Sequence, residues 1–216
     1  MKSGLPSPLK SAVLIAPAPN APVLILWAYD PATADEMDLV ALPLVAHLFD
    51  RQSQPIVVSL LPNGLATARR LFARATDDLA ENQAMKVEAE RAHYIEGGFL
   101  PGGATVLSLL AQDRRAGLIG AREDASPALT QTLAQRWTLA IIVAASTEDV
   151  QQWLELVQPL DHTPVVAFTS AGADPALRPY LDSGQLSGLV SGFDGATAYQ
   201  QLRKRPLSPS EDTVYR

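Results

Sequence analysis

Apolar runs of the buried type alternate with segments of helical pattern along almost the whole chain. Such runs occur at residues 23–28, 55–60, 93–95, 138–144, 164–168 and 188–190. Each is followed by a segment whose apolar residues recur every three or four positions, which is the spacing of one helix face. Strands that alternate with helices predict a parallel sheet with crossover helices.

Six such units fit a doubly wound, Rossmann-like α/β domain with a mostly parallel sheet of five or six strands and helices on both faces. A closed barrel would need about eight units and ~250 residues, whereas the chain has 216. We expect one α/β domain over residues 22–203, after an N-terminal extended segment at 1–21. The charged, proline-bearing tail at 204–216 has the composition of a disordered segment.

The composition excludes several classes of function. The net charge is −6 and no basic cluster stands out, which disfavours binding to nucleic acid. The absence of cysteine removes disulfides, zinc–thiolate sites, iron–sulfur clusters and thiol nucleophiles. Residues 11–29 are apolar but contain three prolines, and the run SAVLIA is short for a signal core. We expect a cytoplasmic or membrane-associated protein, with export left open.

Ligands of open α/β sheets bind where strands end and helices begin, at the carboxyl edge of the sheet. We expect a small-molecule or phosphate-bearing ligand to bind the residues that follow the predicted strands. These ligand-binding candidates are Asp30, Asn63, Glu96, Gly97, Gly98, Gly102, Gly103, Ser146, Ser170, Ser191 and Asp194.

The stretch YIEGGFLPGGATVLSLL, which begins at Tyr94, carries four of these glycines. Glycines permit close approach of backbone amides to a phosphate. The stretch matches neither G-x-G-x-x-G nor a P-loop, because no Lys-Ser/Thr pair follows it. Two readings remain open for it, a phosphate cradle or a tight strand-to-helix connection. The same two apply to residues 191–195.

Each catalytic arrangement that we considered lacks a member. An aspartyl-phosphate enzyme needs a second carboxylate two residues after Asp30, where Ala32 stands, so Asp30 is expected to cap the first helix together with a Thr33–Glu36 capping box. Serine hydrolysis needs a G-x-S-x-G elbow, and the serines near Gly188 have the wrong spacing. We therefore assign no catalytic residue, metal ligand or cofactor.

The remaining titratable residues carry weaker hypotheses. His47, His93 and His162 are expected to be structural or solvated. Carboxylates are hard oxygen ligands of the kind that magnesium prefers. Asp30, Glu96 and Asp194 could therefore share a magnesium ion if their strands are neighbours.

Three stretches resemble an uncharacterised group of bacterial α/β proteins in which such a domain accompanies membrane-spanning helices. They are WAYDPATADEMDLVALPLVAHL from Trp27, YIEGGFLPGG from Tyr94 and SAGADPALRPYLDSGQLSGLVSG from Ser170. The resemblance covers about two thirds of the chain. It implies a link to a membrane through a membrane-protein partner or a cleaved segment, because this chain itself has no apparent spanning helix, and it implies no activity.

These observations favour a non-catalytic small-molecule-binding or protein-interaction domain, as part of a membrane-associated assembly. The alternative is a metal-dependent hydrolase or transferase that acts on a phosphorylated small molecule through Asp30, Glu96 or Asp194.

Overall fold

The computed structural model describes residues 21–51, 53, 55–79, 94–113 and 136–204. Residues 1–20 of the expected extended segment, His93 and residues 205–216 of the expected tail lie outside the described residues.

The described residues form one six-stranded sheet in the order β3-β2-β1-β4-β5-β6, and every strand pair is parallel. The strands are β1 Val23–Ala28, β2 Ile56–Ser59, β3 Ile95–Phe99, β4 Leu139–Ala144, β5 Val165–Thr169 and β6 Gly188–Ser191. This is the strand order of the Rossmann fold, in which the chain runs outward in both directions from the β1–β4 pair.

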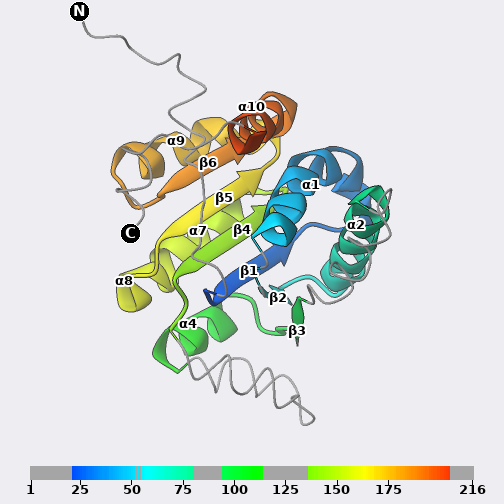
Figure 1. The fold of residues 1–216 in the computed structure, drawn as a ribbon. Coiled ribbons are helices and arrows are strands. Elements are labelled where there is room, and N and C mark those ends of the chain that lie inside the picture. Colours follow the sequence, from blue (N-terminus) through cyan, green and yellow to red (C-terminus); the bar gives the residue numbers. More distant parts are fainter. Residues whose placement is uncertain (1–20, 52, 54, 80–93, 114–135, 205–216) are drawn as a thin grey trace, which may run out of the picture.

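Helices cover both faces of the sheet, so the fold is the expected doubly wound α/β architecture (Figure 1). One face carries α1 Ala34–Asp50, α2 Gly64–Leu79 and α10 Gly192–Lys204. The other carries α4 Ala104–Gln112, α7 Thr147–Leu156, α8 Gln158–Asp161 and α9 Asp174–Asp182. Two short 3-10 turns, η1 Pro31–Thr33 and η2 Ala171–Ala173, lead into α1 and α9.

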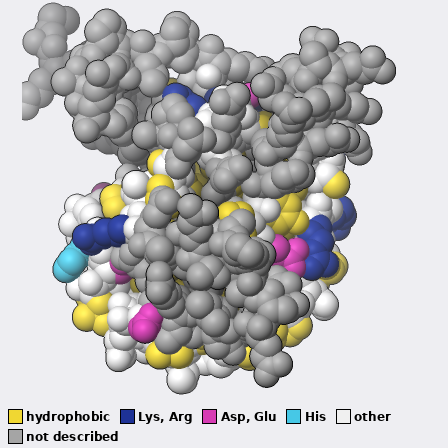
Figure 2. Space-filling view, turned by 60° about the horizontal axis from the view of Figure 1, so that its bottom comes forward, with side chains coloured by type: hydrophobic (Ala, Val, Ile, Leu, Met, Phe, Trp, Pro, Cys, Tyr) yellow, Lys and Arg dark blue, Asp and Glu magenta, His cyan; other side chains and the backbone are white. Residues whose placement is uncertain are grey.

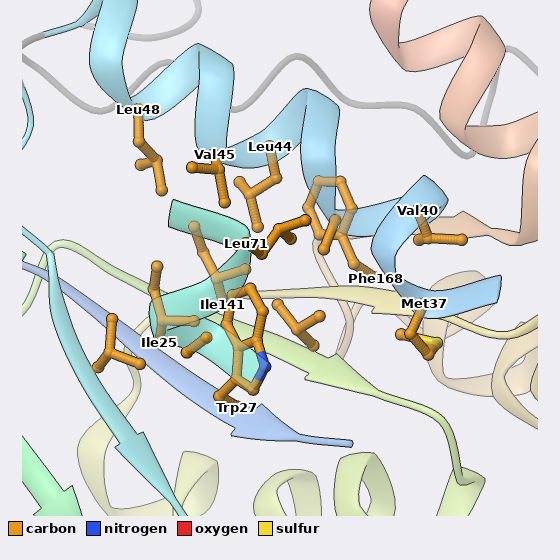
Figure 3. Close-up of a cluster of buried hydrophobic side chains, with 14 of the residues drawn as sticks. Ile25, Trp27, Met37, Val40, Leu44, Val45, Leu48, Leu71, Ile141 and Phe168 are labelled. Carbon is orange, nitrogen blue, oxygen red and sulfur yellow. The ribbon is translucent and has the colours of Figure 1, made fainter. Parts of the chain in front are cut away.

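The central strands β1 and β4 are buried along their whole length, which explains their uninterrupted apolar sequences. Successive side chains point to opposite faces. Ile25 and Trp27 pack under α1, whereas Leu24 and Leu26 pack under the helices of the other face. Figure 3 shows the first of these two cores, in which a stripe of α1 that includes Met37, Leu44 and Leu48 lies over Trp27 and Ile141.

Two boundaries differ from the sequence prediction. The prediction of a loop that begins at Glu96 is wrong, because Glu96, Gly97 and Gly98 lie within β3. Pairing of β3 with β2 skips Gly97, so the glycines form a bulge in the strand and not a loop after it. The loop expected at residues 191–195 is also wrong, because α10 begins at Gly192, directly after β6.

Among the described residues, no helix combines the length and the apolar character that crossing a membrane requires.

Candidate functional site

The carboxyl edge of the sheet begins, in chain order, with the turn after β1. Asp30 Oδ1 accepts a hydrogen bond from the Ala32 amide at 2.9 Å, and the Thr33 amide donates to the Asp30 carbonyl at 3.2 Å. In Rossmann folds this turn carries glycines that present amides to a phosphate. Here the Asp30 carboxylate already accepts the hydrogen bond that the Ala32 amide could give to a phosphate. Asp30 therefore caps the start of the first helical segment, as expected, and its charge disfavours an anion there.

Glu36 does not complete the expected capping box. The Thr33 side chain makes no capping hydrogen bond, and the Glu36 Oε1 atom accepts a hydrogen bond from the Ala171 amide at 2.7 Å. Glu36 thus connects the start of α1 with the η2 turn that follows β5. The capping-box prediction is wrong because a partner 135 residues away in sequence competes for the same carboxylate.

Close packing determines the geometry after β2. The Ser59 Oγ atom lies 2.6 Å from the Trp27 carbonyl oxygen and accepts from the Leu61 amide at 3.0 Å. A Cβ on Gly64 would lie 2.1 Å from Ser59 Oγ and 2.9 Å from the Trp27 carbonyl. Gly64 is therefore required for α2 to start this close to β1 and β2. Asn63 is exposed beside it, and its carbonyl accepts from the Ala66 and Thr67 amides.

In β3, Glu96 forms a two-pronged ion pair with Arg69 of α2, with N–O distances of 2.7 and 2.6 Å. A Cβ on Gly97 would lie 2.6 Å from Val58 Cγ1 and 2.9 Å from Ile56 Cγ2. Gly98 has a φ of 103°. The ion pair with Arg69 accounts for Glu96, and the geometry of the sheet accounts for Gly97 and Gly98. A binding role of these three residues stays a prediction.

The turn after β3 is exposed at its two glycines. Gly102 and Gly103 are exposed and have φ values of 112° and 52°. Apart from the chain next to it, no described residue has an atom within 4 Å of a Cβ placed on Gly103. No acidic residue stands in the first turn of α4. The phosphate-cradle reading of these two glycines therefore meets no steric or charge conflict, and it stays a prediction.

At the end of β4, Ser146 donates a hydrogen bond to Asp149 Oδ2 at 2.8 Å. Partial burial raises the pKa of the Asp149 carboxyl group, although the hydrogen bond from Ser146 opposes the shift. Glu148 stands beside them in the first turn of α7. The amino end of α7 therefore carries two carboxylates of its own, and an anionic ligand is disfavoured there.

Serines at the ends of β5 and β6 also have partners within the fold. Ser170 Oγ donates to the Ala145 carbonyl at 2.8 Å. Ser191 Oγ donates to Asp174, which also accepts two hydrogen bonds from Arg178, at 2.6 and 2.9 Å. Burial opposes ionisation of Asp174, but the hydrogen bonds from Arg178 and Ser191 bring its pKa below the usual value. Neither serine has a histidine beside it within the described residues.

The strand order separates the three carboxylates that we expected to share a magnesium ion. Glu96 lies in β3 and Asp194 follows β6, at opposite edges of the sheet, while Asp30 follows the central strand β1. Five strand spacings of ~4.8 Å put β3 and β6 about 24 Å apart. The described residues contain no group of three or more metal-binding side chains. The shared-magnesium hypothesis is therefore wrong.

Contacts at this edge also involve residues that the sequence did not single out. Glu36 was predicted only as part of a capping box, and no local pattern shows its bond to Ala171 or the bond between Asp174 and Ser191. Thr169, the last residue of β5, is fully buried, and its side-chain oxygen has no hydrogen-bond partner among the described residues.

The loops and helix starts after β1, β4, β5 and β6 are rich in carboxylates. These carboxylates are Asp30, Asp35, Glu36, Glu148, Asp149, Asp174 and Asp194. The turns after β2 and β3 lack acidic residues in the first turn of the following helix. Figure 2 brings the bottom of the view in Figure 1 forward, and the coloured lysine and arginine side chains on that face lie in separate small groups. A negative potential around the loops after β1, β4 and β6 follows from this distribution, whereas Arg178 offsets the charge of Asp174 after β5.

The strand order, the two helical layers and the carboxyl-edge loops define a doubly wound α/β domain of Rossmann order, whose turn after β1 is capped by an aspartate and not built of glycine. Comparisons with protein-family models, curated proteins and solved structures find no match. The resemblance to a membrane-linked bacterial family therefore stays a prediction.

Proposed function

We propose that this protein is a non-catalytic domain that acts by binding other molecules at the carboxyl edge of its sheet. The observation that carries the proposal is the use of the polar groups at this edge. Asp30 caps a turn, Ser170 bonds the Ala145 carbonyl, and Ser191 bonds Asp174. Side chains that maintain the fold in this way leave a shaped and charged surface, which is what recognition requires.

The type of ligand differs along the edge in this proposal. Carboxylates at the ends of β1, β4 and β6 favour a cationic group or a basic protein segment. A phosphate-bearing small molecule fits the turn at Gly102 and Gly103, where no acidic side chain opens the next helix and the glycines are exposed. Participation in a membrane-associated assembly is part of the proposal and rests on the sequence resemblance alone.

Amide chemical-shift mapping of the full chain tests where binding occurs. The probes are ATP, AMP, glucose 6-phosphate and inorganic phosphate, each added with and without magnesium. We expect phosphate-dependent shifts at Gly102 and Gly103 and none at Ala32, whose amide bonds Asp30. Shifts confined to the amino edge of the sheet, where the strands begin near Pro22, Thr138 and Ser187, would refute this location.

Co-purification tests the membrane link. The tagged full chain, expressed at native level in its own host, is extracted in mild detergent and its partners are identified. Recovery of a specific integral membrane protein, without turnover of any substrate, would support the assembly. Recovery of soluble enzymes alone would count against it.

The runner-up is a metal-dependent hydrolase or transferase that acts through Asp30, Glu96 or Asp194. The three carboxylates do not share one ion, because β3 and β6 lie at opposite sides of the sheet. Asp30 and Glu96 already have partners in the Ala32 amide and Arg69, and this alternative stays a prediction.

A further inference from the structure

One corner of the carboxyl edge combines exposed apolar side chains with carboxylates. Phe193, in the first turn of α10, is 65% exposed and is the most exposed large apolar side chain among the described residues. Leu39 in α1 is 48% exposed. Helices α1 and α10 pack side by side on the same face of the sheet (Figure 1). An exposed phenylalanine is costly to leave in water when it has no partner, and a partner that covers it removes this cost.

The η2 turn connects the starts of α1 and α10, the two helices that carry these apolar side chains. Leu39 lies three residues after Glu36, hence on the same side of α1. Glu36 bonds the Ala171 amide, and a Cβ on Gly192 would lie 2.8 Å from the Ala171 Cβ. Gly192 has a φ of 57° and immediately precedes Phe193. The η2 turn thus fixes the start of α10, so Phe193 projects from a rigid position.

The same corner is negatively charged. Asp35 and Glu36 are exposed in the first turn of α1, and Asp194 is exposed beside Phe193. Residues 34–41 of α1 and 192–199 of α10 contain no lysine or arginine. A partner that covers Phe193 must therefore bring positive charge to the rim of the contact.

We propose that this corner, defined by Leu39, Phe193, Asp35, Glu36 and Asp194, docks a segment of another protein in which lysine or arginine flanks apolar side chains. The inference rests on the proposed binding function and deepens it by naming the surface and the chemistry of the partner. Aromatic anchors at the centre of a contact supply most of its affinity, and charges at its rim supply specificity and fast association.

Two other occupants fit less well. A second copy of the chain would bring the same carboxylates to the contact, and like charges would repel. Residues 1–20 carry Lys2 and Lys10 and no acidic residue. They join the described chain at the amino end of β1, however, and α1 and α10 begin at the opposite edge of the sheet. A segment of a separate protein can reach the starts of α1 and α10 without running from the amino edge of the sheet to its carboxyl edge.

Peptide titration followed by amide shifts of the full chain tests the proposal. The probe is a synthetic twelve-residue amphipathic peptide of lysine, leucine and alanine, used at low salt. Its two controls replace every lysine with glutamate or every leucine with serine. We expect shifts centred on Leu39, Phe193 and Asp194 with the probe and with neither control, and weaker binding as salt rises.

Variants make the test specific. Phe193→Ser should weaken binding about tenfold, and Leu39→Ser or the pair Asp35→Asn with Asp194→Asn about threefold to fivefold each. Leu160→Ser, which removes an apolar side chain that is 60% exposed on α8, should leave affinity unchanged. These side chains are exposed, so circular dichroism should show unchanged folding in every variant.

Equal affinity of the wild type and Phe193→Ser, or shifts centred elsewhere, would overturn the inference. So would binding of a peptide of residues 1–20 at this corner that excludes the probe, because the occupant would then be the chain itself. Concentration-dependent dimerisation lost in Phe193→Ser would likewise overturn it. Each of these results leaves the proposed function standing, because that proposal fails on turnover and not on peptide binding.

Discussion

The carboxylate of Glu36 at the start of α1 accepts a hydrogen bond from the backbone amide of Ala171, 135 residues later, at 2.7 Å. The bond joins the segment that follows β1 to the turn that follows β5, and β4 lies between these two strands. The contact therefore spans the central part of the carboxyl edge. It sets the position of η2, against which Gly192 packs.

Replacement of Glu36 by alanine should destabilise the protein by about 1 kcal/mol, because the Ala171 amide loses a charged acceptor but can still bond water. Urea unfolding followed by circular dichroism measures the change. Asp35→Ala is the matched control, since Asp35 is an exposed carboxylate in the same turn. Equal stability of the two variants would show that the bond contributes nothing.

Gly64→Ala should destabilise the protein by about 3 kcal/mol, because the added Cβ would overlap Ser59 Oγ and the backbone carbonyl of Trp27. Gly172→Ala is the control. No atom of the part of the chain that the structure describes lies within 4 Å of a Cβ placed there, so the substitution should be neutral or stabilising by about 0.5 kcal/mol. Thermal and urea unfolding of both variants checks the prediction. A tolerated Gly64→Ala would mean that α2 can move away from β2.

The strands were largely predictable from the sequence. Strand β1 has the predicted bounds, residues 23–28, and β2, β4, β5 and β6 begin and end within one residue of theirs. Strands buried on both faces are continuous apolar runs, and proline, glycine and serine mark their ends. The doubly wound class followed from this alternation.

Strand β3 was mispredicted because its glycines resemble a loop. Their role is visible only in the sheet, where Ile56 and Val58 of the neighbouring strand leave no room for a side chain at Gly97. The start of α10 was missed for a related reason, since the contact of Gly192 with Ala171 is tertiary. The local sequence does not show which residues become neighbours in the folded protein.

The candidate site was predicted only in outline. Most of the chosen residues do lie at the carboxyl edge, because strand ends are local features. Their grouping depends on strand order, which places β3 and β6 at opposite edges. The order of the strands along the sequence does not show their order in the sheet. The sequence alone therefore could not reject the hypothesis of a magnesium ion shared by Asp30, Glu96 and Asp194.

Acid should destabilise the protein through His47. Its ring is buried between α1 and α10, with Nδ1 2.5 Å from Tyr199 Oη. Burial, with Arg51 and Arg203 nearby, lowers the pKa of His47 from 6.5 to about 4. The unfolded chain therefore binds this proton at a higher pH than the folded protein does. The stabilising contribution is complete above pH 6.5 and is lost as the pH falls towards 4, to a total of about 3 kcal/mol.

Urea unfolding of the wild type and of His47→Gln between pH 7 and pH 4 measures this contribution. The variant should be less stable at pH 7, because the pairing with Tyr199 is altered, but its stability should fall less steeply with acid. Parallel curves for the two proteins would show that His47 does not titrate in this range.

The central claim, that this domain binds without catalysis, is tested most directly by a turnover screen of the purified full chain. Generic phosphatase, phosphodiesterase and esterase substrates are supplied with magnesium. Asp30→Asn and Glu96→Gln are assayed in parallel, with folding checked by circular dichroism. We predict no turnover that depends on either carboxylate, because Asp30 bonds the Ala32 amide and Glu96 pairs with Arg69. Turnover by the wild type that disappears in a correctly folded Asp30→Asn or Glu96→Gln variant would contradict the account.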